Sequence, residues 1–164
     1  MVLFRCTKKL LDRLPGAALA AADKSTTALG DWYFKVLPGR PQWLLLGVSE
    51  KSRLPIVLPA RELSTFAPRF LKELEAVLHD LGVTRPAASA ELAAMSPVKF
   101  AKTIDRRVLG SLNDFAFAVQ WSRQDHPTEP LHALNLKLAE TPILPLHDSP
   151  DRITRRLLET RIVH

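Results

Sequence analysis

Basic residues gather at two places in the sequence, each where an extended segment is expected to lead into a helix. The first group consists of Arg5, Thr7, Lys8 and Lys9. The second group consists of Lys99, Lys102, Thr103, Arg106 and Arg107, followed by Ser111, Asn113 and Asp114. The first amides of a helix lack intrahelical acceptors and carry the positive end of its dipole, so cations beside them favour anion binding. If both groups lie at the same edge of one sheet, they form a single anion-binding surface. Otherwise they are a solvated rim, in which Asp114 caps its helix and pairs with Arg107.

These groups favour a binding module without catalysis, which recognises nucleic acid or a phosphorylated small molecule. We expect the phosphate contacts to come from Arg5, Lys8, Lys9, Lys102, Arg106 and Arg107. Trp32 either stacks on a base or lies in the core. The rest of the expected ligand-binding set is Thr7, Ser111, Asn113 and Asp114.

Two other functions stay open at this point. One is a small, metal-independent RNA-cleaving enzyme of toxin type. Asp114 or a histidine would then transfer protons and Arg106 would stabilise the developing phosphate charge. The other is an accessory protein of a toxin–antitoxin or defence system, whose partner would be an acidic protein. The residues do not decide whether the chain is an enzyme.

Motifs of the common cofactor and metal sites are missing from the sequence. The six glycines form neither GxGxxG nor GxxxxGK[ST], and HExxH does not occur. The pair Gly110 and Ser111 does not belong to a GxSxG motif, because Asn113 stands where the second glycine is needed. Glu50 and Lys51 are adjacent and would point to opposite faces of a strand, unlike the Glu-x-Lys of metal-dependent nucleases. We therefore expect no metal and no cofactor, and the five histidines read as isolated surface residues.

Composition indicates a single globular domain, residues 1–164, in a reducing compartment. A hydrophobic content of 46% and a charged content of 24% are typical of a folded protein. No apolar run approaches the roughly 20 residues of a membrane span, and the N-terminus lacks a signal-peptide pattern. The one cysteine, Cys6, excludes an intramolecular disulfide and is expected to be buried. We expect a cytoplasmic, non-membrane protein whose net charge of +6 favours anionic partners.

The elements that must position these residues follow from hydrophobic periodicity. Strands are predicted over residues 2–7, 31–37, 42–48, 54–59 and 97–103. Helices are predicted over residues 8–14, 63–81, 89–95, from 111 onward, over 129–139 and from 149 onward. The class is α+β: a small antiparallel or mixed sheet from the N-terminal part and residues 97–103, packed against several helices.

Helix ends are predicted from capping residues. Ser89 is expected to cap the short alanine-rich helix, and Ser111 with Asp114 to form a capping box. Gly82 is expected to end the long helix, because glycine adopts the left-handed conformation there at little cost. Ser149 followed by proline is expected to start the last helix.

Four stretches of the chain carry a resemblance to known sequences: RCTKKLLDRL at 5–14, TTALGDWY at 26–33, LPIVLPAR at 54–61 and DRRVLGSLNDFAF at 105–117. They resemble an uncharacterised family of small bacterial proteins of unknown function, some from mobile or plasmid-linked regions. Members typically read NRSVLGSMNDF in the last stretch, from which this chain departs at Asp105, Arg107 and Leu112. The resemblance implies no activity, but it raises the interest of Arg5, Thr7, Lys8, Trp32, Arg106, Asn113 and Asp114.

Overall fold

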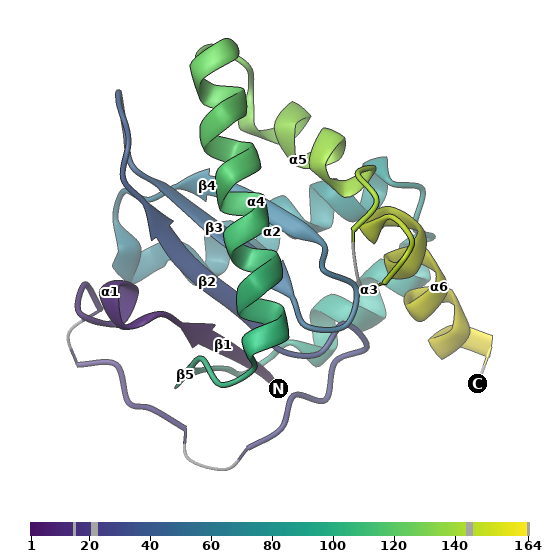
Figure 1. Ribbon diagram of the computed structural model, residues 1–164. Coiled ribbons are helices and arrows are strands. Elements are labelled where there is room, and N and C mark those ends of the chain that lie inside the picture. Colours follow the sequence, from purple (N-terminus) through teal and green to yellow (C-terminus); the bar gives the residue numbers. More distant parts are fainter. Residues whose placement is uncertain (15, 21–22, 144–145, 164) are drawn as a thin grey trace.

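The computed structural model of the chain describes residues 1–14, 16–20, 23–143 and 146–163, and these form an α+β fold (Figure 1). The strands are β1 (Val2–Cys6), β2 (Trp32–Leu37), β3 (Leu44–Ser49), β4 (Pro55–Pro59) and β5 (Val98–Lys102). Each expected strand is present, and no strand end differs from the predicted one by more than two residues. Apolar, β-branched and aromatic residues supply most strand positions, which is why the local pattern sufficed.

Helices surround the sheet. They are α1 (Lys8–Leu11), the single-turn η1 (Leu63–Thr65), α2 (Phe66–Asp80), α3 (Arg85–Ala94), α4 (Arg106–Asp125), α5 (Leu131–Ala139) and α6 (Pro150–Val163). Gly82 ends the long helix at φ +84°, as expected. Ser149 precedes α6 and its carbonyl accepts from the amide of Ile153, which places it at the predicted cap. None of the described helices is long and apolar enough to cross a membrane.

Two helices, α4 and α3, do not begin at the positions predicted from their capping residues. α4 begins at Arg106 rather than Ser111, because the carboxylate of Asp105 accepts from the amides of Arg107 at 2.8 Å and Val108 at 3.4 Å. Ser111 is a buried residue within this helix. α3 is capped by Thr84 rather than by Ser89, and it therefore starts several residues before the predicted position.

The sheet is mixed, with strand order β4-β3-β2-β1-β5. β1 pairs in parallel with both β2 and β5, whereas β2, β3 and β4 form an antiparallel meander. It follows that β1, β2, β4 and β5 point in one direction and end at the same side of the sheet. We call this side the carboxyl end of the sheet. The chain segments that follow these four strands must therefore share one end of the molecule.

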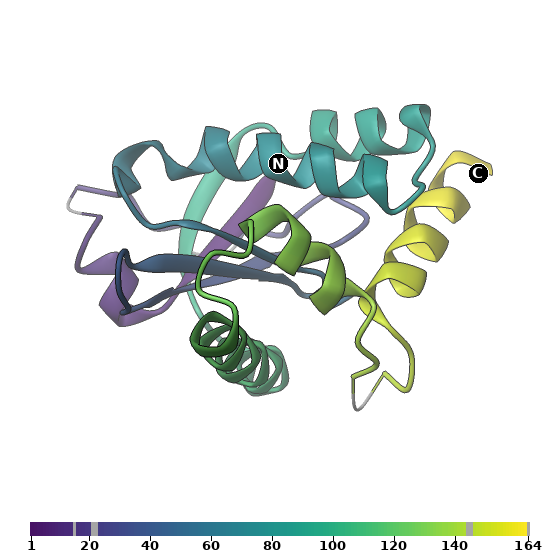
Figure 2. The same cartoon turned by 90° about the horizontal axis from the view of Figure 1, so that it is seen from above.

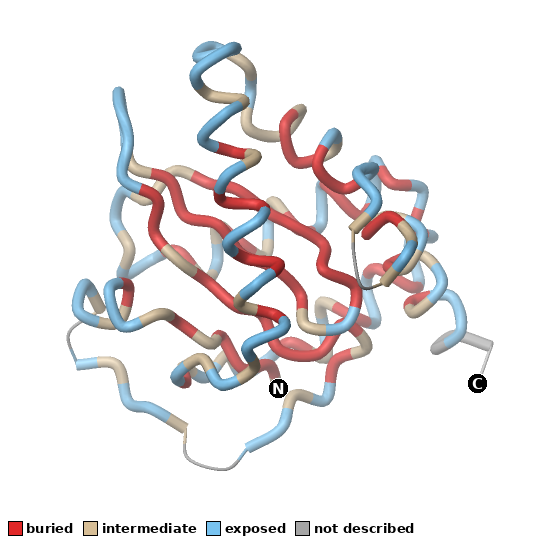
Figure 3. The backbone as a smooth tube through the Cα atoms, in the orientation of Figure 1, coloured by how far each residue is buried: buried red, intermediate tan, exposed pale blue. Residues whose placement is uncertain are grey.

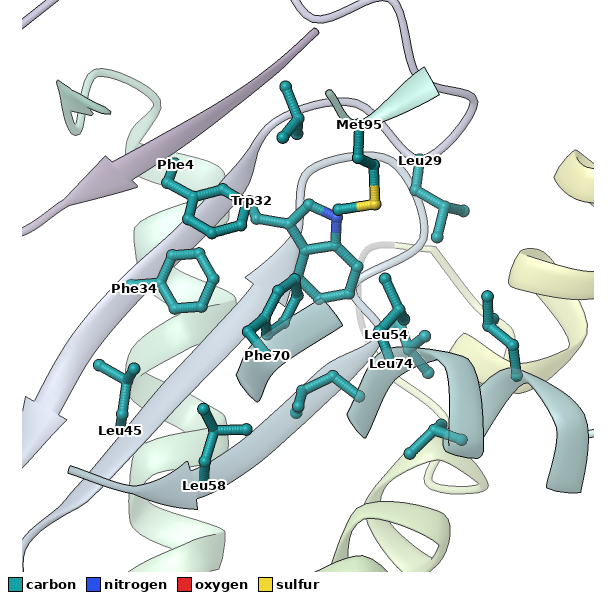
Figure 4. Packing of buried hydrophobic residues seen from close by; sticks show 14 of the residues in the cluster. Phe4, Leu29, Trp32, Phe34, Leu45, Leu54, Leu58, Phe70, Leu74 and Met95 are labelled. Atoms are coloured by element: carbon teal, nitrogen blue, oxygen red, sulfur yellow. The ribbon is translucent and has the colours of Figure 1, made fainter. Parts of the chain in front are cut away.

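Helices cover both faces of the sheet. α2 and α3 lie on one face and α4 on the other, while α5 lies beside β4 (Figure 2). The first face is filled by aromatic rings (Figure 4). The ring centres of Trp32 and Phe70 are 4.8 Å apart in an edge-to-face contact, and those of Phe4 and Phe34 are 4.7 Å apart with the rings tilted. Gly47 is required here, because a Cβ at this position would lie 2.5 Å from the ring of Phe34.

The free edge of the sheet at β4 is closed by a side chain of α5. Asn135 is fully buried, its Oδ1 accepts from the amide of Val57 at 2.7 Å, and its Nδ2 donates to the Val57 carbonyl at 3.2 Å. The amide group thus replaces a neighbouring strand at one residue of the edge. The outward-facing residues of α4, in contrast, are exposed along its length, and no helix of the described part of the chain covers them (Figure 3).

Candidate anion-binding surface

The first basic group is anchored by Arg5, which points from β1 toward the α4 side of the sheet. Its Nε pairs with Asp31 Oδ2 at 2.5 Å, and its Nη1 donates to the carbonyl of Lys102 at 2.8 Å. The Ser25 hydroxyl donates to the other carboxylate oxygen of Asp31 at 2.6 Å. Because the side chains of Arg5 and Asp31 are only 13% and 10% exposed, this ion pair is largely shielded from solvent. Arg5 therefore holds the end of β5 against the start of β2.

The second basic group meets the first one around this arginine. β1 and β5 are paired so that Cys6 lies opposite Lys102, and the two strands end at the same level. Tyr33 lies opposite Arg5 on β2, and its hydroxyl accepts from the amide of Asp105, the residue that caps α4. Burial raises the pKa of Tyr33, so its hydroxyl remains protonated near neutral pH. The structure thus brings the two junctions together, as the anion-binding hypothesis requires.

The N-terminus of α4 is already occupied by a negative charge. Asp105 accepts from two of its first amides, and Arg106 and Arg107 are exposed beside it. The helix dipole is therefore compensated within the chain, and an anion would meet the arginine side chains rather than free amides. The expectation that the amides of this helix form the site is not supported.

Ser111 belongs to a buried interaction that the sequence did not suggest. Its hydroxyl accepts from Nε of Arg53 at 2.9 Å, and both residues are less than a tenth exposed. Arg53 also donates to the carbonyl of Glu50. Burial lowers the pKa of Arg53, and the carboxylates of Asp105 and Glu50 oppose this shift. We call Arg5, Ser25, Asp31, Arg53 and Ser111 the buried polar network.

Asn113 and Asp114 lie further along α4 and on different sides of it. Asn113 Oδ1 accepts from Nζ of Lys35 at 3.1 Å, whereas Asp114 is exposed and borders a small cavity toward residues 141–143. Eight residues separate Arg106 from Asp114, which is about 12 Å along a helix axis. Asp114 is therefore not adjacent to Arg106, as the version of the RNA-cleaving hypothesis that uses this acid requires, and Asp114 does not cap α4.

Trp32 has no accessible surface and packs against Phe70. It lies in the core and has no face on which a base could stack, so we remove it from the candidate ligand-binding residues. Cys6 is buried as expected, and burial raises the pKa of its thiol to about 12, which makes it unreactive.

His132 is not an isolated surface histidine. Its two ring nitrogens each lie 2.6 Å from a carboxylate oxygen, Nδ1 from Glu73 and Nε2 from Asp80. Hydrogen bonds that His132 donates to Asp80 and Glu73 raise the pKa of the histidine, because both ring nitrogens can donate only in the charged form. The residue links α2 to α5. No group of metal-binding side chains occurs among the described residues.

The carboxyl end of the sheet also carries exposed cations, which do not belong to the buried polar network. Five of them lie in the segments that follow β1, β2 and β4, and the sixth is the last residue of β5. We call this group the basic end: Lys8, Lys9, Arg13, Arg40, Arg61 and Lys102. Within the described part of the chain none of the six belongs to an ion pair. The acidic side chains next to them in sequence are Asp12 and Glu62. The local charge is therefore strongly positive.

Trp43 lies among these cations just before β3. The ammonium of Lys9 is 5.3 Å from the centre of its ring, and the guanidinium of Arg13 is 4.0 Å from it. These cation–π contacts hold the two side chains over the ring without neutralising their charge.

The expected ligand residues thus divide into four sets. Lys8, Lys9 and Lys102 belong to the basic end and Thr7 lies beside them. Arg106 and Arg107 border this region at the start of α4. Arg5, Ser111 and Trp32 are structural, while Asn113 and Asp114 lie farther along the helix. Arg13, Arg40 and Arg61 are not among the ligand residues expected from the sequence, because only the shared direction of four strands places them beside the lysines.

These features define a small α+β protein with a mixed five-stranded sheet and a basic surface at the carboxyl end of that sheet. The family model of a domain of unknown function, DUF6933, matches residues 3–152. The chain belongs to this family, in agreement with the resemblance seen in the sequence. No curated protein matches the chain.

Proposed function

We propose that the protein binds nucleic acid, without catalysing a reaction, through the basic end of the sheet. The observation that carries this proposal is that the six exposed cations of the basic end lack ion pairs within the described chain. Exposed like charges repel one another and add nothing to the stability of the fold. A polyanion neutralises several of them at once and releases counterions from its own backbone.

The arrangement of the cations favours an extended ligand. They are distributed over the ends of separate strands, and Arg106 and Arg107 continue the surface along the first turn of α4. The cations do not gather in one pocket, since Arg13 and Arg61 line one hollow and Arg40 lines another. Charges spread in this way suit a chain of phosphates better than a single phosphorylated metabolite, which is usually held in one pocket. Arg5 and Thr7 contribute by position: Arg5 fixes the ends of β1 and β5 against each other.

The test is the binding of a fluorescently labelled oligonucleotide, measured by anisotropy between roughly 50 and 200 mM salt. We expect affinity to fall steeply with salt. Replacing Lys8 and Lys102 by alanine together should weaken binding about tenfold. The slope of log affinity against log salt should fall by roughly 0.7 to 0.9 for each phosphate that the variant no longer neutralises.

The matched control is the double variant Lys51→Ala with Lys72→Ala, two exposed lysines outside the basic end with the same change in net charge. It should bind almost as well as the wild type. Equal weakening by both double variants would mean unspecific charge attraction and would overturn the proposal. Displacement of the oligonucleotide by a nucleoside triphosphate at the same phosphate concentration would instead assign a small phosphorylated ligand. Cleavage of the RNA that Asp114→Ala abolishes would assign an enzyme.

A further inference from the structure

A cavity of about 430 Å³ lies between the turn that joins β2 to β3 and the C-terminal half of α4. Its floor is apolar and is formed by Leu37, Leu44 and Val119, which are buried in the core beneath α4. Its rim is polar and includes Arg40 of the basic end and Arg123 of α4. A hollow with an apolar floor and a few polar groups around it is the usual form of a ligand site.

Three glutamine side chains complete the rim: Gln42, Gln120 and Gln124. None of their amide groups makes a hydrogen bond to the described part of the chain. Each amide offers both donors and an acceptor, which is the combination that recognises the edge of a nucleobase. The volume, the apolar floor and the free amides together fit one unpaired base.

Two exposed aromatic rings lie directly beside this cavity. Phe117 is 78% exposed and Trp121 is 70% exposed, and they are one helical turn apart on the outer side of α4. Gln120 and Gln124 line the cavity and also the shallow hollow next to these rings, so the two features are continuous. Large apolar side chains exposed to this extent mark a contact surface rather than a structural need.

We infer that the groove formed by the cavity and by Phe117 and Trp121 binds single-stranded nucleic acid, with one base in the cavity and neighbouring bases stacked on the two rings. This inference rests on the proposed function and names its substrate class. Stacking on aromatic side chains requires bases that are free of a duplex, because paired bases already stack on each other. Arg40 belongs both to the cavity rim and to the basic end, so phosphates on the basic end lead directly to bases in the groove.

Charge complementarity argues against a second copy of the chain as the occupant. The net charge is +6, and the rim of the groove contains two arginines. Two identical basic surfaces would repel each other. A single strand of nucleic acid, in contrast, supplies bases that stack on the two aromatic rings and phosphates that carry negative charge. Asp114 lines a separate hollow toward residues 141–143 and lines neither the cavity nor the hollow beside the two rings.

The experiment compares one labelled strand with the duplex of the same sequence, using the wild type and the double variant Phe117→Ala with Trp121→Ala. The variant should lose about tenfold or more in affinity for the single strand, since each stacked base contributes substantially to binding. Its affinity for the duplex and its salt slope should stay unchanged. Ile104→Ala, which truncates another side chain of similar exposure (70%), is the matched control and should bind like the wild type.

A second readout does not depend on affinity. Of the three tryptophans, Trp32 is buried, Trp43 is half-buried and Trp121 is exposed. The single strand should quench the fluorescence of the wild type more strongly than that of Trp121→Phe, in which Trp43 among the basic-end cations is the remaining accessible tryptophan. Because both aromatic residues are exposed, the midpoint of thermal unfolding should not change in either variant.

The outcomes separate this inference from the proposed function. Unchanged binding of the single strand by the Phe117/Trp121 variant, together with weak binding by the Lys8/Lys102 variant, would overturn the inference and leave the function standing. Failure of the wild type to bind either form would overturn both. Self-association of the wild type that the aromatic variant abolishes, without any change in oligonucleotide binding, would assign the rings to a protein interface and also overturn the inference.

Discussion

The buried polar network and the basic end both contain arginine or lysine. The cations of the network have partners within the fold, whereas those of the basic end have no carboxylate partner in the described chain. In the network, Arg5 pairs with Asp31, and Arg53 donates to Ser111 and to the backbone. At the basic end, cations such as Lys8 and Arg61 have no carboxylate partner in the described chain. A charge that leaves water must find partners within the fold, whereas an exposed charge need not.

The difference teaches how to interpret groups of charged residues. Arg5 and Lys8 are three residues apart in sequence, and their proximity predicts that they belong to one site. In the structure Arg5 holds three strands together, and Lys8 faces solvent. Only residues of the second kind remain available for a ligand. Substitutions should therefore separate the two regions, with effects on stability in one and on binding in the other.

The largest expected effect on stability is that of Asp31→Ala. It leaves the guanidinium of Arg5 shielded from solvent without its carboxylate partner, and it removes the acceptor of Ser25. We expect the free energy of unfolding to fall by about 3 kcal/mol. Denaturation by urea at neutral pH measures this change.

The control for this prediction is Asp23→Ala, which breaks the pair between Asp23 and Lys99. Both of these side chains are more than 40% exposed, so the loss should stay below about 1 kcal/mol. A double variant, Arg5→Met with Asp31→Leu, removes both charges and should lose less than Asp31→Ala alone. Equal losses for Asp31→Ala and Asp23→Ala would contradict the distinction between the two kinds of charge.

A smaller effect is expected from pH, at the histidine that links α2 to α5. Asp80 and Glu73 raise the pKa of His132 in the folded protein, so its contribution to stability is complete below the unfolded value of about 6.5. It is lost as pH rises through the raised folded pKa. Hydrogen bonds from His132 and His79 lower the pKa of Asp80, so the same interaction is also lost in acid, as pH falls below the ordinary value of 3.8 for this carboxyl and through its lowered folded pKa.

Thermal unfolding of the wild type and of His132→Gln at about pH 5.5 and pH 8.5 tests this sign. The wild type should exceed the variant in stability at the lower pH, and the advantage should shrink at the higher pH. His126→Gln, at an exposed histidine, should follow the wild type at both values. An advantage that grows with pH would exclude a charged His132. The basic end contains no histidine, so binding there should not follow this profile.

The smallest effect on stability is expected at the basic end. Lys8→Ala with Arg61→Ala should change the free energy of unfolding by less than about 0.5 kcal/mol, because both side chains are exposed and unpaired. Urea denaturation at low salt is the measurement. Arg155→Ala is a useful contrast, since its guanidinium donates to the carbonyl of Leu81 and should cost more. A loss above about 1.5 kcal/mol in the double variant would show that these cations support the fold.

Much of the fold could be predicted from local patterns. The runs VLFRC, WYFKVL and PIVLP are strands because their apolar residues match the spacing of a buried sheet. The predicted start of α4 was wrong because Asp105 and Ser111 are both good caps, and the sequence contains no rule that ranks them. Phe117 and Trp121 lie outside the buried face of α4 wherever the helix begins, because residue spacing and not the first residue sets which side chains share a face. The spacing of Leu112, Phe115 and Val119 in the sequence therefore already predicts that both rings are exposed.

The sequence by itself determined the α+β class, the positive charge, the burial of Cys6 and the stop at Gly82, because each depends on residue type or on near neighbours. Only the tertiary structure decided which cations are satisfied. Arg5 finds Asp31 26 residues away, and Arg53 finds Ser111 58 residues away. It also decided that β1, β2, β4 and β5 end together, which places their flanking cations at one end of the molecule. Strand direction is a property of the whole sheet, and no local pattern encodes it.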